Sequence, residues 1–594
     1  MTKPLRIGGA SGFWGDAPHA TQQLLRTPGL DFLVYDYLAE ITMSIMARAR
    51  LKDPQKGYAV DFVSDVMAQN LTRIAEAGVK VLSNAGGVNP SACAEALRVM
   101  SAELGLGLKI AVVEGDDLMP RVAEFADRTE MFSGAPMPIE DKIASINAYI
   151  GAGPIVAALQ AGADIVITGR CVDSALTLAA CMYYFGWQHE QYDLLAAGSL
   201  AGHLLECGPQ STGGNFTDWE MAGDIALIGY PVAEISADGA AVLTKPEGTT
   251  GCVTPASICE QMLYEIGDPQ SYMLPDVICD LSNVKLKQTD PDRVRVTGAK
   301  GRAPTGQLKV SVTWADGYRA GLTFLINGRD ARQKAKVFAQ AGLDRARAVL
   351  QQLGAPDYRD VSLEAFGGRP GDGDYEEISF KAAVKHDDPR AVGLFLRELT
   401  GAALATPPGM HIFTGGGRPK PSPVVALFSF LVPETILTYR VAVDGKDIPY
   451  NSPPVAPQNP APVRANIPKP TEQSVSDWAE RPLEDLAWAR SGDKGDKANV
   501  GVIARNPAYL PYIWSALTED TLSAVFADFL SGSVERYYLP GTHAMNIVLN
   551  EVLGGGGVAS LRNDAQGKSF AQILLATPVK VPAGLIANSE QGDF

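Results

Sequence analysis

The chain has 594 residues, of which 46% are apolar and 20% are charged, and its 67 acidic against 51 basic residues give a formal net charge of −16. This composition is typical of a globular protein that buries a large core, and the length allows several domains. The negative charge, without a local basic stripe, disfavours nucleic acid and anionic membranes as partners.

We expect no targeting segment and no membrane anchor. Met1–Pro4 runs straight into a strand-like segment, so we expect no signal peptide and a cytoplasmic protein. No uncharged apolar run reaches about 18 residues, so we expect no membrane span. The seven cysteines form no C-x-x-C pair, and their odd number argues against a full disulfide framework. We therefore predict seven free thiols in a reducing compartment.

Short apolar runs alternate with longer amphipathic stretches in the first half of the chain. The apolar runs predicted as strands are Leu5–Ile7, Phe32–Tyr35, Val79–Leu82, Ile110–Val113 and Ile165–Ile167. The periodic segments predicted as helices between them include Val63–Ala77, Ser91–Glu103 and Asp141–Ala161. Strands that alternate with helices indicate βαβ units, and hence an α/β fold with a mostly parallel sheet that helices cover on both faces.

The ends of these predicted strands indicate where a ligand would bind. Each strand ends in a cluster of glycine, asparagine or acidic residues immediately before the next helix. In open parallel sheets, ligands bind outside the carboxyl ends of the strands. We therefore expect polar side chains to gather at one edge of the sheet, where they would line a crevice.

The pattern changes in the second part of the chain, where alternating runs such as Leu308–Val312 predict antiparallel strands and Lys334–Leu353 predicts a long helix. A later stretch is rich in proline and predicts an extended linker. The predicted segments are an α/β body over 1–230, an α+β extension over 231–445, a proline-rich linker over 446–480 and a small α+β domain over 481–594.

Six blocks of residues are distinctive: Gly8–Asp16, Asp36–Glu40, Ser83–Pro90, Asn147–Ser174, His203–Gly214 and Ala489–Gly501. The first five, in this order, resemble the acyclic terpene utilisation protein A (AtuA) family. The sixth resembles the small ferredoxin-like domain often fused to it. The resemblance covers essentially the whole chain and implies a ferredoxin-like fold for the C-terminal domain. It also implies a role in degrading citronellol- and geraniol-like terpenoids through CoA thioesters of branched acids, but it implies no particular catalytic residues.

The glycine-rich segment at 84–90 is the strongest local signal for a binding site. Gly86 and Gly87 let the backbone approach a ligand or turn tightly, and the helix that follows directs free N–H groups at the loop. Such a helix start favours a carboxylate, phosphate or enolate oxygen, so these glycines, Asn84 and Asn89 are candidates for substrate binding. The alternative is a plain strand-to-helix turn capped by Asn89 or the next serine.

The first glycine-rich loop, Gly8–Asp16, does not match the spacing of a dinucleotide-binding G-x-G-x-x-G motif. The aromatic pair Phe13 and Trp14 is also atypical of that motif. We expect Trp14 either to cover an organic ligand or to belong to the core.

The pair Asp36 and Glu40 follows an apolar run directly and lies at the start of a predicted helix. A carboxylate at the crevice edge can have a raised pKa and act as a general base, although acidic residues at a helix start are also ordinary partners of the helix dipole. After a later strand, Arg170 is placed to hold a carboxylate or phosphate in a bidentate grip. Asp173 is expected to pair with Arg170 structurally.

His203 and Glu206 are three residues apart on a predicted helix and are therefore neighbours. They form either an acid/base pair, two metal ligands or a structural ion pair. The motif lacks the second histidine of the helical zinc motif, so we predict no resident metal. The loop that follows contains Thr212 and Gly213, which we predict to supply hydrogen-bond donors to a substrate.

The C-terminal segment Ser491–Asn499 is rich in turn residues and carries charges of alternating sign. Such a pattern is usual for a solvated loop, but its glycines also suit an anion-binding concavity. We expect Asp493 and Lys494 either to complete the crevice or to fix the domain interface.

The leading hypothesis is an enzyme that acts on an acyl-CoA thioester or another carboxylate substrate. Enolate-type chemistry needs a general base, for which Asp36, Glu40 or the pair His203 and Glu206 qualify, and it needs donors for the developing oxyanion. A hydratase, a lyase and an isomerase all fit this set of residues. We expect no cofactor, with CoA present only as part of the substrate, and we expect a homo-oligomer.

Two other hypotheses remain open from the sequence. The first is metal-assisted hydrolysis with Asp36, His203 and Glu206, or with Asp493 and Asp496. The second is a non-enzymatic ligand-binding or scaffold subunit of a catabolic complex.

The proline content of the linker predicts where a protease cuts first. Limited proteolysis should cleave within about 450–480, because an extended segment without a hydrogen-bonded ladder enters a protease site readily. Mass spectrometry of the products should find a large stable fragment and a small C-terminal fragment. A first cut inside 1–230 would contradict the proposed division of the chain.

Overall fold

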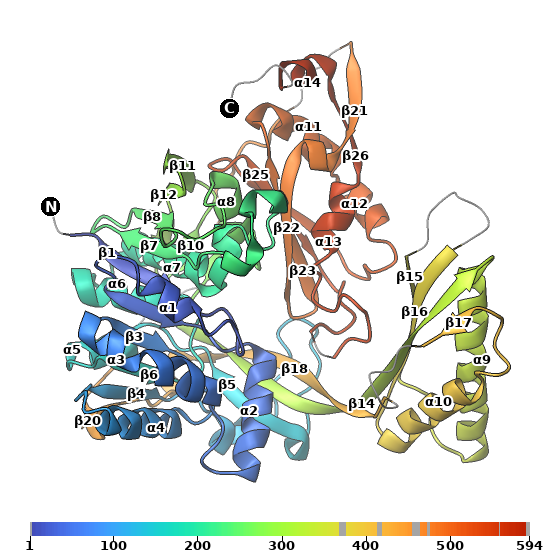
Figure 1. Ribbon diagram of the computed structural model, residues 1–594, viewed down its shortest axis with the longest axis horizontal. Coiled ribbons are helices and arrows are strands. Elements are labelled where there is room, and N and C mark those ends of the chain that lie inside the picture. The colour runs from blue at the N-terminus through green and yellow to red at the C-terminus, as the bar shows by residue number, and fades with distance from the viewer. Residues whose placement is uncertain are drawn as a thin grey trace.

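A computed structural model describes residues 3–367, 376–412, 419–453, 464–471, 476–557 and 559–589. It has three parts, visible in Figure 1: a large body in blue and green, a lobe in yellow that projects to one side, and a C-terminal domain in orange and red that lies against the body.

The centre of the body is a parallel sheet, as predicted. Its five parallel strands lie in the order β1 (Leu5–Gly9), β2 (Phe32–Tyr35), β3 (Lys80–Ser83), β6 (Ile165–Thr168) and β4 (Ile110–Glu114). Each of these strands coincides with a predicted apolar run. The carboxyl ends of all five therefore meet at one edge of the sheet.

Helices cover both faces of this sheet because its strands are apolar on both sides. In β2, Phe32 and Val34 enter one hydrophobic core while Leu33 and Tyr35 enter the other. The first core is closed by α5 (Gly153–Gln160), α6 (Ala175–Phe185) and α7 (Tyr192–Glu206). The second core is closed by α1 (Ala20–Leu24), α2 (Glu40–Lys52), α3 (Ala68–Ala77) and α4 (Pro90–Glu103).

Antiparallel strands extend the sheet at both edges. Beyond β1 lie β7 (Val232–Ile235), β8 (Ala241–Thr244), β12 (Arg293–Thr297) and β11 (Lys285–Asp290), and beyond β4 lie β19 (Arg440–Val443) and β20 (Lys446–Ile448). The segments before and after residue 230 therefore share one sheet, because β7 pairs with β1.

A second, antiparallel sheet is built around β14 (Gln307–Gly328), a strand of 22 residues. Its other strands are β5 (Ile143–Ala148), β15 (Asp360–Gly367), β16 (Glu376–His386), β17 (Met410–His411) and β18 (Ser422–Pro433). In the projecting lobe, α9 (Ala331–Gln352) and α10 (Pro389–Gly401) pack on this sheet around a separate core (Figure 1). The predicted antiparallel strands and the long helix are confirmed.

The predicted helix Asp141–Ala161 is wrong in its first half. Residues Ile143–Ala148 form β5, which pairs with β14, and the helix α5 begins only at Gly153. The backbone groups of β5 find their partners more than a hundred residues further along the chain. Local periodicity does not reveal such a partner, whereas Pro154 just inside α5 marks the true helix start.

The C-terminal domain is an α+β domain. Its four-stranded antiparallel sheet has the order β22 (Ala487–Lys494), β23 (Lys497–Ala504), β25 (Ala544–Leu549) and β24 (Val534–Leu539), and a separate pair is formed by β21 (Trp478–Pro482) and β26 (Pro578–Pro582). The helices that pack with them are α11 (Leu510–Ala516), α12 (Glu519–Val525), α13 (Phe570–Leu575) and α14 (Ala583–Ser589). Within the predicted linker, residues 454–463 and 472–475 lie outside the described residues.

All seven cysteines lie in described positions and are unpaired, so the predicted free thiols are confirmed. Among the described residues, no helix combines the length and the apolar character needed to cross a membrane.

The C-terminal domain is fixed to the body by a buried ion pair. Arg490 on β22 contacts Glu260 on α8 (Pro255–Leu263) with 3.0 Å between Nη2 and Oε2, and the two side chains are 6% and 0% exposed. The same guanidinium donates to the carbonyl oxygen of Gly214 at 3.0 Å and to Gln210. A charged group buried in this way is stable only when it is paired and hydrogen-bonded, so the docked position is strongly specified.

Replacing one partner of this pair should therefore destabilise the protein. We expect Arg490→Met to lower the free energy of unfolding by about 3–5 kcal/mol, because it leaves the Glu260 carboxylate buried without its cation. Urea unfolding measures the effect, and the double variant Arg490→Met/Glu260→Met should recover most of the loss.

The control is the exposed ion pair between Lys300 and Asp193, which lie 2.7 Å apart with side chains 66% and 55% exposed. Lys300→Met should change the free energy of unfolding by less than about 1 kcal/mol. Equal effects of the two single substitutions would contradict the special role of the buried pair.

Candidate functional site

Polar side chains gather at the carboxyl ends of the parallel strands, as the sequence predicts. Asp36 follows β2, and its Oδ1 accepts hydrogen bonds from Asn84 Nδ2 at 2.5 Å and from the Leu38 backbone N–H at 3.2 Å. Asn84 follows β3, is fully buried, and also accepts from the backbone N–H of Tyr37 at 2.7 Å. The amide of Asn84 therefore fixes the carboxyl group of Asp36 at the edge of the sheet.

The environment of Asp36 disfavours its charged form. The residue is 8% exposed. Burial raises its pKa well above the ordinary value, and the nearby carboxylates of Asp173 and Glu206 raise it further, against the opposing charge of Arg170. A carboxyl group with a raised pKa at a strand end is typical of general acid/base catalysts.

Glu40, the first residue of α2, has the opposite behaviour. Its Oε1 accepts from the hydroxyl group of Tyr149 at 2.6 Å and lies 3.3 Å from Nζ of Lys309 on β14. Burial opposes ionisation, but the charges of Lys309 and Arg170 and the Tyr149 hydrogen bond hold the pKa of Glu40 well below its usual range. Glu40 is therefore an ionised anchor rather than a proton carrier.

The charge of Arg170 lowers the pKa of both Asp36 and Glu40. Arg170 is 4% exposed, its Nη1 lies 2.6 Å from Asp173 Oδ1, and its guanidinium carbon lies 4.2 Å from the centre of the Tyr149 ring. The ion pair with Asp173 and the contact with an aromatic face are both favourable for a guanidinium. The pairing of Arg170 with Asp173 agrees with the prediction.

Three buried polar atoms in this region have no hydrogen-bond partner among the described residues: Arg170 Nε, Asn147 Oδ1 and Ser311 Oγ. Their side chains surround one small closed gap together with Glu40 and Tyr149, and this gap is too narrow for a water molecule. Unpartnered buried polar atoms are rare in proteins, and three of them in one place mark this region as unusual.

Asp116 was not among the predicted site residues. It holds the backbone of Arg170 in place. Its Oδ2 accepts from the Arg170 backbone N–H and from Asn147 Nδ2, both at 2.8 Å. Burial raises its pKa to about 7 against the opposing effect of these bonds. The acidic cluster after β4 was visible in the sequence, but nothing in it distinguished Asp116 from its neighbours.

His203 and Glu206 form a buried pair near the end of α7. His203 Nδ1 lies 2.8 Å from Glu206 Oε1, and His203 is 2% exposed. Burial opposes protonation, but the Glu206 carboxylate raises the pKa of His203 above its ordinary value. His203 Nε2 is buried and has no partner within the described residues.

The C-terminal domain brings a cation to the same region. Lys494, at the end of β22, lies 3.7 Å from Glu265, which follows α8. Desolvation opposes it, but the Glu265 carboxylate, the Tyr272 hydroxyl group and the Glu40 carboxylate hold the pKa of Lys494 well above its usual value. The groups that act on Lys494 therefore come from distant parts of the chain, near residue 40 and near residues 265–272. We call Asp36, Glu40, Arg170, Asp173, His203, Glu206, Lys309 and Lys494 the strand-end cluster.

Asp493, next to Lys494, forms its ion pair with Lys568. Its Oδ1 lies 3.3 Å from Lys568 Nζ, and burial together with the Glu265 charge raises its pKa to about 6. Asp493 and Lys494 belong to a β-hairpin with a turn at Gly495 and Asp496, not to a solvated loop. The loop interpretation of the alternating charges is therefore wrong, because the alternation follows the two faces of a strand.

Gly87 and Asn89 line a cavity of about 260 Å³ together with Asp116. The backbone N–H groups of Gly87 and Asn89 are bonded within the loop, and Asn89 caps α4. A side chain at Gly86 would meet the Thr168 carbonyl oxygen at 2.5 Å, and one at Gly87 would meet Met46. Close packing accounts for the two glycines, and the predicted binding role of this segment stays a prediction.

The remaining predicted residues have structural partners. Trp14 is half-buried and donates from Nε1 to Asp61 at 2.6 Å. Thr212 is buried, and its hydroxyl group donates to the carbonyl oxygens of Pro209 and Gly229. Gly213 adopts a φ of +102°, where a side chain would also approach Cys252. These contacts leave Thr212 and Gly213 without a free donor for the cluster.

The residues weighed for a metal centre, although Asp36, His203 and Glu206 share the cluster, are not arranged as metal ligands. In the part of the chain that the structure describes, no group of three or more His, Cys, Asp or Glu side chains is arranged to hold a metal ion. Asp496 accepts from the backbone N–H groups of Leu553 and Gly555, so it braces a loop of its own domain.

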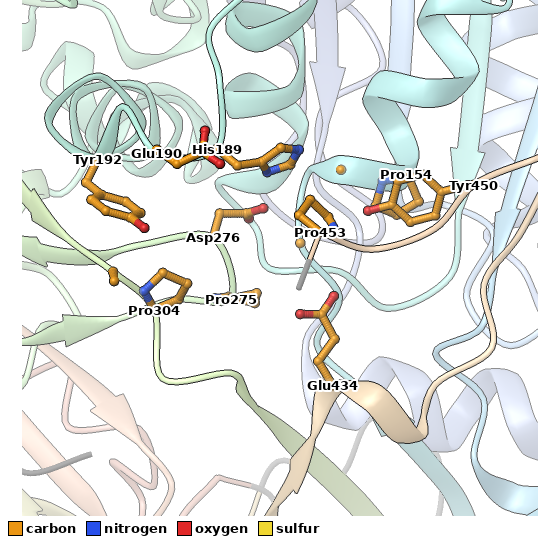
Figure 2. Close-up of a pocket in the computed structure, with 13 residues that line it drawn as sticks. Pro154, His189, Glu190, Tyr192, Pro275, Asp276, Pro304, Glu434, Tyr450 and Pro453 are labelled. Carbon is orange, nitrogen blue, oxygen red and sulfur yellow. The ribbon is translucent and has the colours of Figure 1, made fainter. Parts of the chain in front are cut away.

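Figure 2 shows another cavity of the body, about 220 Å³ in volume. Tyr192, Asp276, Glu434 and Tyr450 line it, and both oxygens of Asp276 accept from the backbone N–H of Ala152 near the start of α5. No predicted site residue is among the described residues that line it. Asp276 has a structural task there as the partner of a helix start.

Three residues in or beside the strand-end cluster escaped the sequence analysis. Tyr149 lay inside a recognised block but carried no motif, and Lys309 and Glu265 lay in segments predicted only as strand and extension. For Lys309, no local signal exists, because its partner Glu40 is 269 residues away in the chain.

Comparison with protein families gave two matches. A family described as acyclic terpene utilisation family protein AtuA matches residues 5–443, and one described as the AtuA ferredoxin-like domain matches residues 481–580. No curated protein and no solved structure matches the chain.

The raised pKa of Asp116 predicts how stability depends on pH. In the unfolded chain its carboxyl group ionises near pH 4, but in the folded protein it holds its proton to about pH 7. Folding therefore retains a proton that unfolding releases, and this group's contribution to stability falls as pH rises from 4 to 7. The slope is at most about 1.4 kcal/mol per pH unit.

Asp116→Asn cannot titrate, and so it should remove this contribution. We expect the unfolding free energy of the wild type, relative to the variant, to fall steadily between pH 4.5 and 6.5. Urea unfolding at three pH values measures it. Parallel curves for the two proteins would contradict the assignment.

Proposed function

Because the chain belongs to the acyclic terpene utilisation family AtuA, we propose that it is an enzyme of acyclic terpenoid or branched-acid degradation. In this proposal it acts on an acyl-CoA thioester by proton transfer next to the carbonyl group. CoA enters as part of the substrate, and no other cofactor takes part. The observation that carries the proposal is the buried carboxyl group of Asp36, held by Asn84 beside Arg170 at the carboxyl edge of the parallel sheet.

Asp36 has the properties that this chemistry needs in a base. Removal of a proton next to a thioester requires a base whose pKa lies closer to neutrality than that of an ordinary carboxylate. Burial and the nearby Asp173 and Glu206 carboxylates raise the pKa of Asp36 in this direction. The bond from Asn84 fixes one oxygen and leaves the other for the substrate.

The enolate that forms carries negative charge on its oxygen, and the cluster supplies donors for it. Arg170 Nε is buried and lacks a partner among the described residues, so it can donate to an oxyanion without breaking an existing bond. Donors that are already oriented in a site of low dielectric constant account for a large part of catalysis in such reactions. Lys309 and Lys494 add positive charge on the same side.

His203 is the candidate for a second proton transfer. Its Nδ1 is bonded to Glu206, which fixes the orientation of the ring, and its Nε2 has no partner among the described residues. A histidine oriented by a carboxylate can return a proton to another carbon or to a leaving group. An acid at a second position allows hydration, isomerisation or cleavage after the shared first step.

A non-enzymatic ligand-binding subunit would not need this arrangement. Carboxyl groups with strongly shifted pKa values and unpartnered donors are costly to bury, and such costs are typical of catalytic sites. The convergence of Asp36, Arg170 and His203 supports an enzyme over a scaffold.

The shared first step can be tested without knowledge of the product. We expect the protein to exchange α- or γ-hydrogen atoms of branched saturated or unsaturated acyl-CoA thioesters for deuterium in D2O, detected by mass spectrometry. Asp36→Asn should slow this exchange by about 100-fold or more, because loss of a general base typically costs 10²–10⁴ in rate.

The matched control is Asp164→Asn. Asp164 lies at the opposite, amino-terminal edge of the same sheet, where it pairs with Lys80 at 3.2 Å. This variant should exchange at the wild-type rate. If no thioester in the panel exchanges faster with the wild type than with Asp36→Asn, the proposed function is wrong.

A further inference from the structure

Glu265 has an unfavourable backbone conformation. It follows α8 with a φ of +58°, in the left-handed region. A residue with a side chain pays a steric penalty there, and glutamate is less suited to it than asparagine or aspartate, which can bond their own backbone. Such conformations persist only where the surrounding structure holds them, and they are concentrated at functional sites.

The C-terminal domain holds this conformation in place. The backbone N–H of Glu265 donates to Asn499 Oδ1 at 2.9 Å, and Asn499 Nδ2 donates to the carbonyl oxygen of Leu263 at 2.6 Å. Asn546 bonds to Asn499 and donates to the carbonyl oxygen of Ile266 at 2.7 Å. Two buried asparagines of one domain thus clamp the end of α8 in the other.

The side chain of Glu265 lies between two lysines of the C-terminal domain. It is 3.7 Å from Lys494 and 3.9 Å from Lys568, measured from carboxylate oxygen to Nζ. Lys568 has further partners in Asp493, at 3.3 Å, and in the hydroxyl group of Tyr264. The ion-pair partner of Lys494 among the described residues is Glu265.

Lys494 needs such a partner. It is the last residue of β22 before the hairpin turn, and its side chain is 51% exposed. A long side chain at this position would sample many rotamers in solvent. The Glu265 carboxylate at its ammonium group limits these rotamers, and in the observed one the charge of Lys494 acts on Glu40, Asp173 and His203.

From this geometry we infer that Glu265 is a positioning residue, whose strained backbone and docked carboxylate hold Lys494 in the strand-end cluster. The catalytic meaning of this inference rests on the proposed function, but the placement of Lys494 can be measured separately. If the residue served only to turn the chain, glycine would be the better choice, because it adopts this φ without strain.

The first experiment measures the reactivity of Lys494. Wild type and Glu265→Gln are labelled with a trace of acetic anhydride, and mass spectrometry quantifies acetylation at each lysine. We expect Lys494 to label about tenfold faster in the variant, because loss of an adjacent carboxylate lowers the pKa of an amine by about one unit or more. Lys309, which pairs with Glu40, is the internal control and should label at an unchanged rate.

Two results would overturn the inference. Unchanged labelling of Lys494 would show that Glu265 does not hold it. An equal change at Lys494 and Lys309 would show a general loosening of the cluster rather than a positioning effect.

The second experiment separates strain from positioning. Glu265→Gly removes both the steric penalty and the carboxylate, so we expect a higher urea midpoint of unfolding together with slower deuterium exchange, by about tenfold or more. Glu265→Asp keeps a charge on a shorter arm and should recover part of the rate. A glycine variant that is more stable and exchanges at the wild-type rate would overturn the inference. If Lys494 labels faster in Glu265→Gln but the wild type exchanges no thioester, the proposed function alone is refuted and the positioning inference stands.

Discussion

The site depends on the buried ion pair between Arg490 and Glu260. Glu260 lies on α8, which also contacts the His203 region through Gln261, whose amide donates to the His203 carbonyl oxygen at 3.1 Å. The ion pair therefore joins β22, which ends at Lys494, to α8, which ends shortly before the strained residue Glu265. Through Gln261, α8 is in turn bonded to α7, which carries the His203–Glu206 pair. Because the Arg490–Glu260 pair is fully desolvated, small displacements of either domain are costly, and the position of the hairpin is fixed.

The second constraint is the balance of charge inside the strand-end cluster. Four carboxyl groups share the cluster with Arg170, Lys309, Lys494 and His203, and burial together with mutual repulsion raises the pKa of Asp36 and that of Glu206. The carboxyl groups therefore behave in two ways. Glu40 is held ionised by Lys309, Arg170 and Tyr149, while burial keeps a proton on Asp36, and on Asp116 beside the cluster, up to a higher pH than usual. Carboxyl groups whose environments drive their pKa values apart are the usual basis for assigning acid and base roles.

Membership of the family associates the chain with acyclic terpene utilisation. The geometry adds which residues lie together at the edge of the sheet. The cluster is composite: the parallel sheet contributes Asp36 and Arg170, the antiparallel sheet contributes Lys309, and the ferredoxin-like domain contributes Lys494. Because the cluster draws on three parts of one chain, the ferredoxin-like domain must hold a fixed position, and its buried ion pair with the body provides this.

The sequence by itself determined the parallel sheet, its polar edge, Asp36, Arg170 and the His203–Glu206 pair. These follow from local signals: apolar runs that end in polar residues, and residues spaced by one helical turn. The tertiary structure alone decided that Ile143–Ala148 is a strand, that Gly86 and Gly87 pack closely, that Lys309 pairs with Glu40 and that Lys494 pairs with Glu265. The physical reason is that strand pairing and domain docking join residues hundreds of positions apart, and such contacts leave no trace in local periodicity.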